Sequence, residues 1–299
     1  MRRRASLPEA KGVTIRCERL DNTLSRPLQY EAFSIAQNTV GKNMTRTLQF
    51  HIEELIPYIN WVYFYHAWGV NSEQGREIRA EADLLLARWA EEKRQTRFRV
   101  RLFKAHSSEE DILLYGDKGD MHVLPLLRQQ SPPYLCLADF LPPVSMPAET
   151  MGVFASMVPF RVDDLLGQTL ADRLAEASAE RGHEIVRKDI WGYAPDEDLT
   201  PGDMFAERYR GKRPAVGYPS LPDQSLNFVL ADLLDFPSLG ISLTENGAMI
   251  PHASTTGLMI SHPQCRHFKV GTIGEDQLAD YASRRGTSPD ALRRFMDIA

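Results

Sequence analysis

One loop of the sequence combines the residue types best suited to hold a small ligand: Arg213-Pro214-Ala215-Val216-Gly217-Tyr218-Pro219. A guanidinium such as that of Arg213 grips a carboxylate through two parallel hydrogen bonds. Gly217 permits close approach of a ligand to the backbone, and Tyr218 can offer a hydroxyl group or a ring face to a cation. The loop therefore suits a ligand that carries both a carboxylate and a positive centre. Taken alone, however, the loop is better explained as a surface turn with a solvated arginine.

A second candidate feature is a stripe of acidic residues on a predicted helix. Residues 164–187 have apolar side chains at helical spacing, at Leu166, Leu170, Leu174 and Ala177. Asp172, Glu176 and Glu180 follow one another at intervals of four, so a helix places them on one other face. Without further information, such a stripe is best explained as a solvated helix face.

Several common motifs are absent from the sequence. It contains no Gly-x-Gly-x-x-Gly after a strand, no Walker-type loop and no Gly-x-Ser-x-Gly elbow. His252, His262, Cys265 and His267 are residue types that bind metals, but their spacing matches no zinc signature. We therefore predict no metal site, and polar residues on a strand pair and its turn account for this cluster.

Composition places the chain among ordinary globular proteins. Its 299 residues are 43% hydrophobic and 25% charged, and the net charge of −5 provides no basic surface for nucleic acid. No apolar run is long enough to span a bilayer, and none follows the basic residues 2–4 as a signal peptide requires. Three widely spaced cysteines imply no disulfide framework. We expect a reduced, cytoplasmic protein without a membrane or nucleic-acid partner.

The elements expected around these residues do not alternate regularly as β-α-β units, which favours an α+β fold. Residues 1–48 are polar and weakly periodic and are predicted to form an irregular N-terminal arm. Helices are expected at 71–94, 164–187 and 275–285, and a last helix begins after Ser288 with Pro289 at its first position. Strands are expected at 111–115 and 151–158, and within 240–250, 257–261 and 267–272.

With these motifs placed, the chain from about Glu53 to its end resembles the S-adenosylmethionine-binding reactivation domain of cobalamin-dependent methionine synthase. The resemblance rests on several sequence blocks that occur in one order. They are Tyr58-Ile59-Asn60-Trp61, residues 124–130, 136–140 and 170–180, Trp191-Gly192-Tyr193-Ala194-Pro195, residues 209–219, Leu243-Thr244-Glu245, Ser261-His262-Pro263 and residues 276–286.

The resemblance implies a single α+β domain over residues 49–299, C-shaped around a bent antiparallel sheet with flanking helices. It also implies a shallow cleft for S-adenosylmethionine (AdoMet), with no further cofactor. Arg213 matches the arginine that holds the ligand's carboxylate, within a loop that also contains Ala215, Gly217 and Tyr218. Glu176 and Glu207 match acidic residues near the sulfonium, and His267 and Phe268 match an aromatic pair at the nucleoside.

The sequence also departs from the family's pattern. Asn60 stands where the family has an aspartate for the ligand's amino group, so a charged contact has become neutral. The run 221–227 lacks the histidine and the charged pair with which the family faces its corrinoid partner. The chain also contains no Asp-x-His-x-x-Gly corrinoid-binding motif.

Two functions therefore stay open, and the altered run 221–227 favours the first. The chain is either an enzyme that cyclises the aminobutyryl arm of AdoMet, without cobalamin or pyridoxal phosphate, or a reactivation module. The enzyme would release methylthioadenosine and form 1-aminocyclopropane-1-carboxylate or an azetidine acid, with Glu176, Glu207 or Tyr218 as the base. The module would present AdoMet to a corrinoid on a separate protein.

Overall fold

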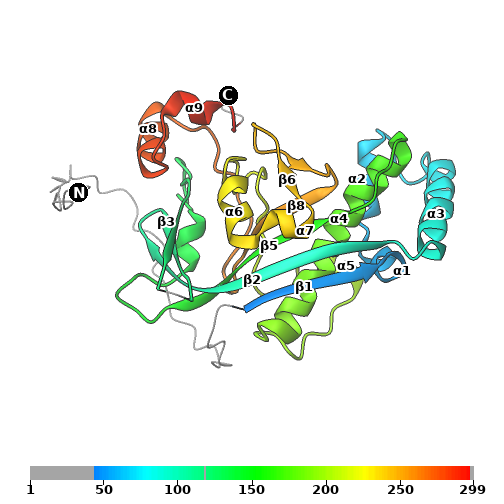
Figure 1. Cartoon of the computed structure of the whole chain (residues 1–299), viewed down its shortest axis with the longest axis horizontal. Coiled ribbons are helices and arrows are strands. Elements are labelled where there is room, and N and C mark those ends of the chain that lie inside the picture. The colour runs from blue at the N-terminus through cyan, green and yellow to red at the C-terminus, as the bar shows by residue number, and fades with distance from the viewer. Residues whose placement is uncertain (1–43, 118, 297–299) are drawn as a thin grey trace, which may run out of the picture.

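The computed structural model describes residues 44–117 and 119–296, and a six-stranded antiparallel sheet runs along the molecule (Figure 1). The strand order is β4-β3-β2-β5-β8, and β1 pairs with the same edge of β2 as β3 does. The strands are β1 (Met44–His51), β2 (Gln95–Ser108), β3 (Asp111–Tyr115), β4 (Met121–Pro125), β5 (Glu149–Met157) and β8 (Ser254–Met259). A separate two-stranded sheet joins β6 (Ser242–Leu243) to β7 (Met249–Ile250).

Strand β2 organises the sheet because it is long enough to pair with three neighbours. Its first half pairs with β1, its last residues pair with β3, and β5 covers most of its other edge. Side chains alternate between the two faces of a strand, and Phe98, Val100 and Leu102 accordingly lie in one apolar core while Phe103 and Ala105 lie in the other. The sheet is therefore buried on both faces.

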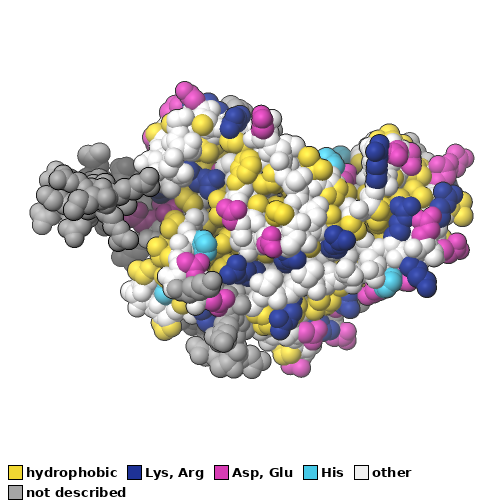
Figure 2. Space-filling view, in the orientation of Figure 1, with side chains coloured by type: hydrophobic (Ala, Val, Ile, Leu, Met, Phe, Trp, Pro, Cys, Tyr) yellow, Lys and Arg dark blue, Asp and Glu magenta, His cyan; other side chains and the backbone are white. Residues whose placement is uncertain are grey.

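The arginines of β2 alternate with these apolar residues and stabilise the ends of two short helices. The last carbonyl groups of a helix have no partner within it and need external donors. Three guanidinium groups supply them: Arg101 donates to the Leu233 carbonyl oxygen at 3.1 Å, Arg99 to that of Leu234 at 2.8 Å, and Arg97 to that of Leu239 at 3.0 Å. Figure 2 shows basic side chains over the region of β1 and β2, interspersed with acidic ones.

The helices form layers on both faces of the sheet. One face is covered by α1 (Ile52–Leu55), the 3-10 turn η1 (Ile56–Tyr58), α2 (Trp61–Ala67), α3 (Arg76–Glu91) and α4 (Leu165–Ile185), and the other by α6 (Leu226–Leu234) and α7 (Phe236–Leu239). A smaller cluster holds α8 (Glu275–Arg284) and α9 (Pro289–Arg293). The remaining elements are the 3-10 turn η2 (Leu137–Phe140), the π-helical turn η3 (Val186–Ile190) and α5 (Pro201–Phe205). This architecture confirms the predicted α+β class.

Most predicted elements are confirmed, with three corrections. Residues 267–272 form no strand, and the predicted helix 71–94 begins only at Arg76. Residues 44–48 belong to β1, so the predicted irregular arm is wrong there, while residues 1–43 lie outside the described part of the chain. The capping prediction holds, because the Ser288 hydroxyl accepts a hydrogen bond from the Ala291 amide at 3.2 Å.

Helix α4 packs on β2 so closely that a side chain is excluded at Gly182. A Cβ atom there would lie 2.6 Å from the ring of Phe98, which is fully buried. We expect Gly182→Ala to lower the free energy of unfolding by about 1–3 kcal/mol, because overpacking outweighs the gain in helix propensity. Urea titration measures the change. Gly202→Ala in α5, where a Cβ atom meets only the Thr200 hydroxyl at 3.7 Å, is the matched control and should be neutral or stabilising.

Candidate ligand-binding cleft

The loop that carries Arg213 is fixed because it runs beside β8 like a further strand. Lys212 exchanges two backbone hydrogen bonds with Ile260, and the Leu258 amide donates to the Pro214 carbonyl oxygen at 2.9 Å. Gly257 permits this approach, since a Cβ atom there would lie 2.2 Å from the Pro214 carbonyl oxygen. The backbone on both sides of Arg213 is thus anchored to the central sheet.

Helix α4 presents the acidic wall opposite this loop. The helix begins at Leu165, where the Asp164 side chain accepts from the Gly167 amide at 2.7 Å. Its helical period then places Arg173, Glu176 and Glu180 on the side that faces the loop. The third residue of the predicted stripe, Asp172, lies outside the cleft and pairs with His252 at 3.2 Å.

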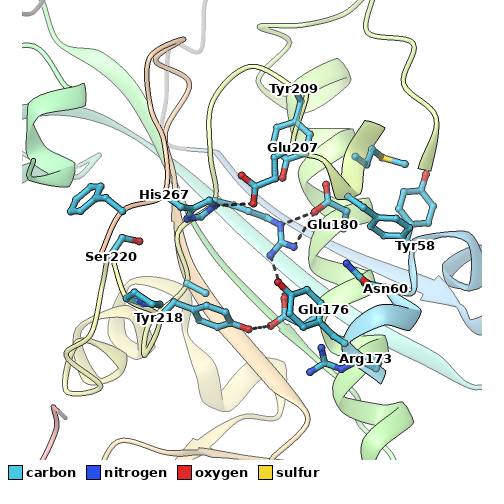
Figure 3. A pocket seen from close by; sticks show the side chains of 17 residues that line it. Tyr58, Asn60, Arg173, Glu176, Glu180, Glu207, Tyr209, Tyr218, Ser220 and His267 are labelled. Atoms are coloured by element: carbon cyan, nitrogen blue, oxygen red, sulfur yellow. Dashed lines mark hydrogen bonds and ion pairs between the residues drawn. The ribbon is translucent and has the colours of Figure 1, made fainter. Parts of the chain in front are cut away.

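Between the loop and α4 lies a cleft with a volume of about 530 Å³, the size of a small-molecule site (Figure 3). Five segments contribute to it: the end of η1 with the start of α2, α4, α5 with the residues after it, the Arg213 loop, and the segment at 267–268. The lining residues are Tyr58, Asn60, Tyr63, Arg173, Glu176, Glu180, Met204, Phe205, Glu207, Tyr209, Arg213, Ala215, Tyr218, Pro219, Ser220, His267 and Phe268.

The guanidinium of Arg213 lies between two glutamates of α4. Its Nε and Nη2 donate to Oε2 of Glu180 at 3.2 and 3.0 Å, and its Nη1 donates to Oε2 of Glu176 at 3.4 Å. Burial disfavours the charged guanidinium, but the two carboxylates outweigh burial and raise the pKa of Arg213. These contacts use three of the five N–H groups, which leaves one on each terminal nitrogen for a ligand carboxylate.

Glu207, from the segment after α5, adds a further carboxylate to the cleft (Figure 3). Its backbone has a φ of 52°, in the left-handed region that few residues other than glycine adopt. Its side chain pairs with His267 at 3.3 Å and with Lys212 at 3.8 Å. Burial acts to raise the pKa of Glu207, but these neighbours outweigh it and hold the pKa below its ordinary value. A carboxylate with a lowered pKa is a weaker base.

Tyr218 closes one side of the cleft by reaching across to α4. Its hydroxyl donates to Oε1 of Glu176 at 3.1 Å, while half of its side chain stays exposed at the rim. The Glu176 carboxylate, together with burial, raises the pKa of Tyr218 to about 12. Tyr218 is therefore a hydrogen-bond donor at neutral pH, which weakens its candidacy as a base.

The structure brings together nearly all the ligand-binding residues expected from the sequence. Asn60, Glu176, Glu207, Arg213, Ala215, Tyr218, His267 and Phe268 all line the cleft. Gly217 does not line the cleft. Its φ is 86°, and its amide donates a hydrogen bond to the Leu221 carbonyl oxygen, so it shapes the turn that follows. Asn60 has a structural role as well, because its Oδ1 accepts from the Val62 amide and caps α2.

Sequence analysis missed part of the cleft wall, namely Tyr58, Arg173, Glu180 and Tyr209. Glu180 had a signal, since it belongs to the acidic stripe, and helical spacing alone predicts that it shares a face with Glu176. Tyr58 and Tyr209 had none, because no local pattern distinguishes a tyrosine in a cleft from one in the core. Tyr209 is held from behind by the guanidinium of Arg187, 4.1 Å from its ring centroid.

Most of the run 221–227 is buried, which limits the inference that sequence analysis drew from it. Five of its seven side chains are buried, those of Leu221, Asp223, Ser225, Leu226 and Asn227. Asp223 is fully buried and accepts a hydrogen bond from the Tyr281 hydroxyl of α8 at 2.7 Å. These positions hold α6 and α8 together, so packing rather than a partner surface sets their identity. The charged pair of the family's pattern falls on the buried positions Leu226 and Asn227, so its loss is no evidence against docking to a partner. Gln224, where the family's pattern has the histidine, is exposed.

Within residues 44–117 and 119–296, no three His, Cys, Asp or Glu side chains are grouped so as to hold a metal ion. Across the same residues, every helix is too short or too polar to cross a bilayer. The histidines of the candidate cluster serve different partners, since His252 pairs with Asp172 and His267 with Glu207.

Fold and cleft together define a class: a single α+β module whose cleft combines one clamped arginine with three carboxylates. The chain matches the family model described as the activation domain of vitamin B12 dependent methionine synthase over residues 51–286, and it belongs to this family. Among solved structures, it is similar to the MetH reactivation domain bound to AdoHcy. The two share 33% sequence identity with a TM-score of 0.79, over 85% of this chain and 90% of that chain.

Proposed function

We propose that the protein binds AdoMet in this cleft and presents the methyl group to a corrinoid on a separate protein. The observation that carries the proposal is the set formed by Arg213 and its three acidic neighbours in a chain of this family. A relative of the same fold is bound to AdoHcy, the compound that AdoMet becomes when it loses its methyl group.

The charges of the cleft match the chemistry of the proposed ligand. AdoMet carries a carboxylate, an α-ammonium group and a sulfonium, so one anionic and two cationic groups need partners. Arg213 supplies a bidentate donor for the carboxylate, and Glu176, Glu180 and Glu207 supply negative charge for the two cations. The apolar side chains of Met204, Phe205 and Phe268 offer contacts for the nucleoside.

Methyl transfer requires the cleft to position the ligand rather than to remove a proton. The reduced Co(I) corrinoid is the nucleophile: a carbon–cobalt bond forms while the sulfur–methyl bond breaks, and the electron pair of the broken bond stays on sulfur. AdoHcy and a methylated Co(III) corrinoid are the products, and an external one-electron donor supplies the Co(I) state. Holding the sulfonium at the open side of the cleft lowers the entropic part of the barrier.

Ring closure through the α-carbon makes a demand that the cleft meets poorly. It needs a strong base for a weakly acidic proton, and three groups were candidates. Tyr218 keeps its proton and donates a hydrogen bond to Glu176, and the lowered pKa of Glu207 reduces the basicity of that carboxylate. Glu176 already accepts from both Tyr218 and Arg213. The comparisons and the cleft thus support the reactivation module over the enzyme that sequence analysis favoured.

The two functions predict different products from AdoMet. We expect the purified chain alone to leave AdoMet intact. With cob(I)alamin, prepared by titanium(III) citrate under anaerobic conditions, we expect AdoHcy and methylcobalamin in equal amounts, faster than in the protein-free reaction. Liquid chromatography of the nucleosides and the absorbance of the corrinoid measure both products.

The same assay contains the result that overturns the proposal. Release of methylthioadenosine from AdoMet without any corrinoid would establish the ring-closing enzyme instead. AdoMet binding with no methyl transfer, either to free cob(I)alamin or to a cob(I)alamin-loaded corrinoid protein that lacks its own activation domain, would reject the proposal.

A further inference from the structure

Three carboxylates line the cleft, and they differ in how completely their oxygens are partnered. Both oxygens of Glu176 accept hydrogen bonds, Oε1 from Tyr218 and Oε2 from Arg213. Both oxygens of Glu207 have partners as well: Oε1 lies 3.3 Å from Nε2 of His267 and Oε2 lies 3.8 Å from Nζ of Lys212. The oxygens of these two residues are therefore all engaged within the protein.

Glu180 is different. Its side chain is only 8% exposed, and its Oε2 accepts both hydrogen bonds from the side edge of Arg213. Its Oε1 is buried without a hydrogen-bond partner in the described part of the chain. A buried acceptor left unsatisfied is costly and rare in folded proteins. Since Glu180 lines the cleft, a donor on the ligand can supply what the protein does not.

We propose that Glu180 is the residue that binds the α-ammonium group of the ligand, a step that rests on the proposed binding of AdoMet. The carboxylate and ammonium of an amino acid are attached to the same carbon, so they must bind side by side. Glu180 accepts from Nη2 of Arg213 at 3.0 Å, and Nη2 is one of the two nitrogens with an N–H group left for the ligand carboxylate. A turn of the Glu180 carboxyl group about its last torsion, which is a soft one, brings Oε1 toward the ammonium.

The side chain of Asn60, the other candidate for the ammonium group, supports the assignment to Glu180. Asn60 lines the same cleft, but it carries no charge and its Oδ1 is engaged with the Val62 amide at the start of α2. A cation in a partly buried site binds best to an anion with free acceptor capacity. Of the cleft residues that the structure describes, Glu180 has such an acceptor, so Arg213 and Glu180 together form a clamp for a zwitterion.

The experiment compares AdoHcy with its desamino analogue, which keeps the carboxylate and lacks only the amino group. Isothermal titration calorimetry gives the affinity of both for the full chain and for Glu180→Gln. We expect the unaltered protein to prefer AdoHcy by about tenfold or more, as a hydrogen bond between charged groups implies. Glu180→Gln should remove most of this preference. A purely structural role, exerted through Arg213, would weaken both ligands equally and leave the ratio unchanged.

Glu176→Gln is the matched control, because Glu176 also contacts Arg213 but has no free oxygen. It should change the affinity for both ligands by the same factor and preserve the ratio. A ratio that Glu180→Gln leaves intact would overturn the assignment of Glu180. Failure of the unaltered protein to bind AdoHcy at all would instead reject the proposed function.

Discussion

Arg213→Ala is expected to lower the affinity for AdoHcy by about a hundredfold or more, because it removes both hydrogen bonds of a charged carboxylate clamp. The substitution also leaves the Glu176 and Glu180 carboxylates next to each other without their shared cation. Without that cation, the negative charge of the two carboxylates repels the carboxylate of the ligand. Isothermal titration calorimetry at constant ionic strength measures the loss.

Two comparisons separate a lost clamp from a damaged fold. Methylthioadenosine has no carboxylate, so its affinity should change far less than that of AdoHcy when Arg213 is removed. Arg213→Lys keeps the charge but cannot donate two parallel hydrogen bonds, so it should restore only part of the affinity. Arg173→Ala alters a second arginine of the same cleft and should cause a smaller loss. Equal losses for both ligands would contradict the assignment of Arg213 to the carboxylate.

The residues of this cleft were easier to predict from the sequence than the central sheet that positions them. The Arg213 loop and the acidic stripe of α4 carry local signals, a proline-stiffened turn and a repeat of four. Strand β2 was missed although it is the centre of the sheet. Its alternating arginines are typical of a solvated surface, and only the folded structure shows them bonded to the helix ends of α6 and α7.

The run 221–227 shows a second limit of sequence reasoning. A loss of charged residues reads as a lost partner surface only if those positions are exposed, and burial is a property of the whole fold. Asp223 is a polar residue in a turn-rich segment, yet it is fully buried under the Tyr281 hydroxyl. The pairing of Asp223 with Tyr281, 58 positions apart, leaves no local pattern, so the sequence alone could not show that most of this run is buried.

Glu197→Ala is expected to have the largest effect on stability, about 3–5 kcal/mol, because it leaves a buried guanidinium without its counterion. Arg187 is fully buried, and its Nε and Nη2 donate to the Glu197 carboxylate at distances between 2.6 and 3.0 Å. Arg187 also backs Tyr209, the wall of the cleft, at 4.1 Å. We therefore expect a lower Tm, by about 6–20 °C for a domain of this size, together with weaker ligand binding.

The control is the ion pair of Arg76 and Glu73, whose side chains are 75% and 81% exposed. Glu73→Ala should leave the Tm nearly unchanged, because solvent already screens that pair. The double variant Arg187→Met, Glu197→Leu should recover much of the stability, since an apolar pair of similar size carries no desolvation cost. It should not recover ligand binding to the same extent, because a methionine supplies no cation behind the Tyr209 ring. Equal recovery of both properties would mean that the buried pair acts through packing alone.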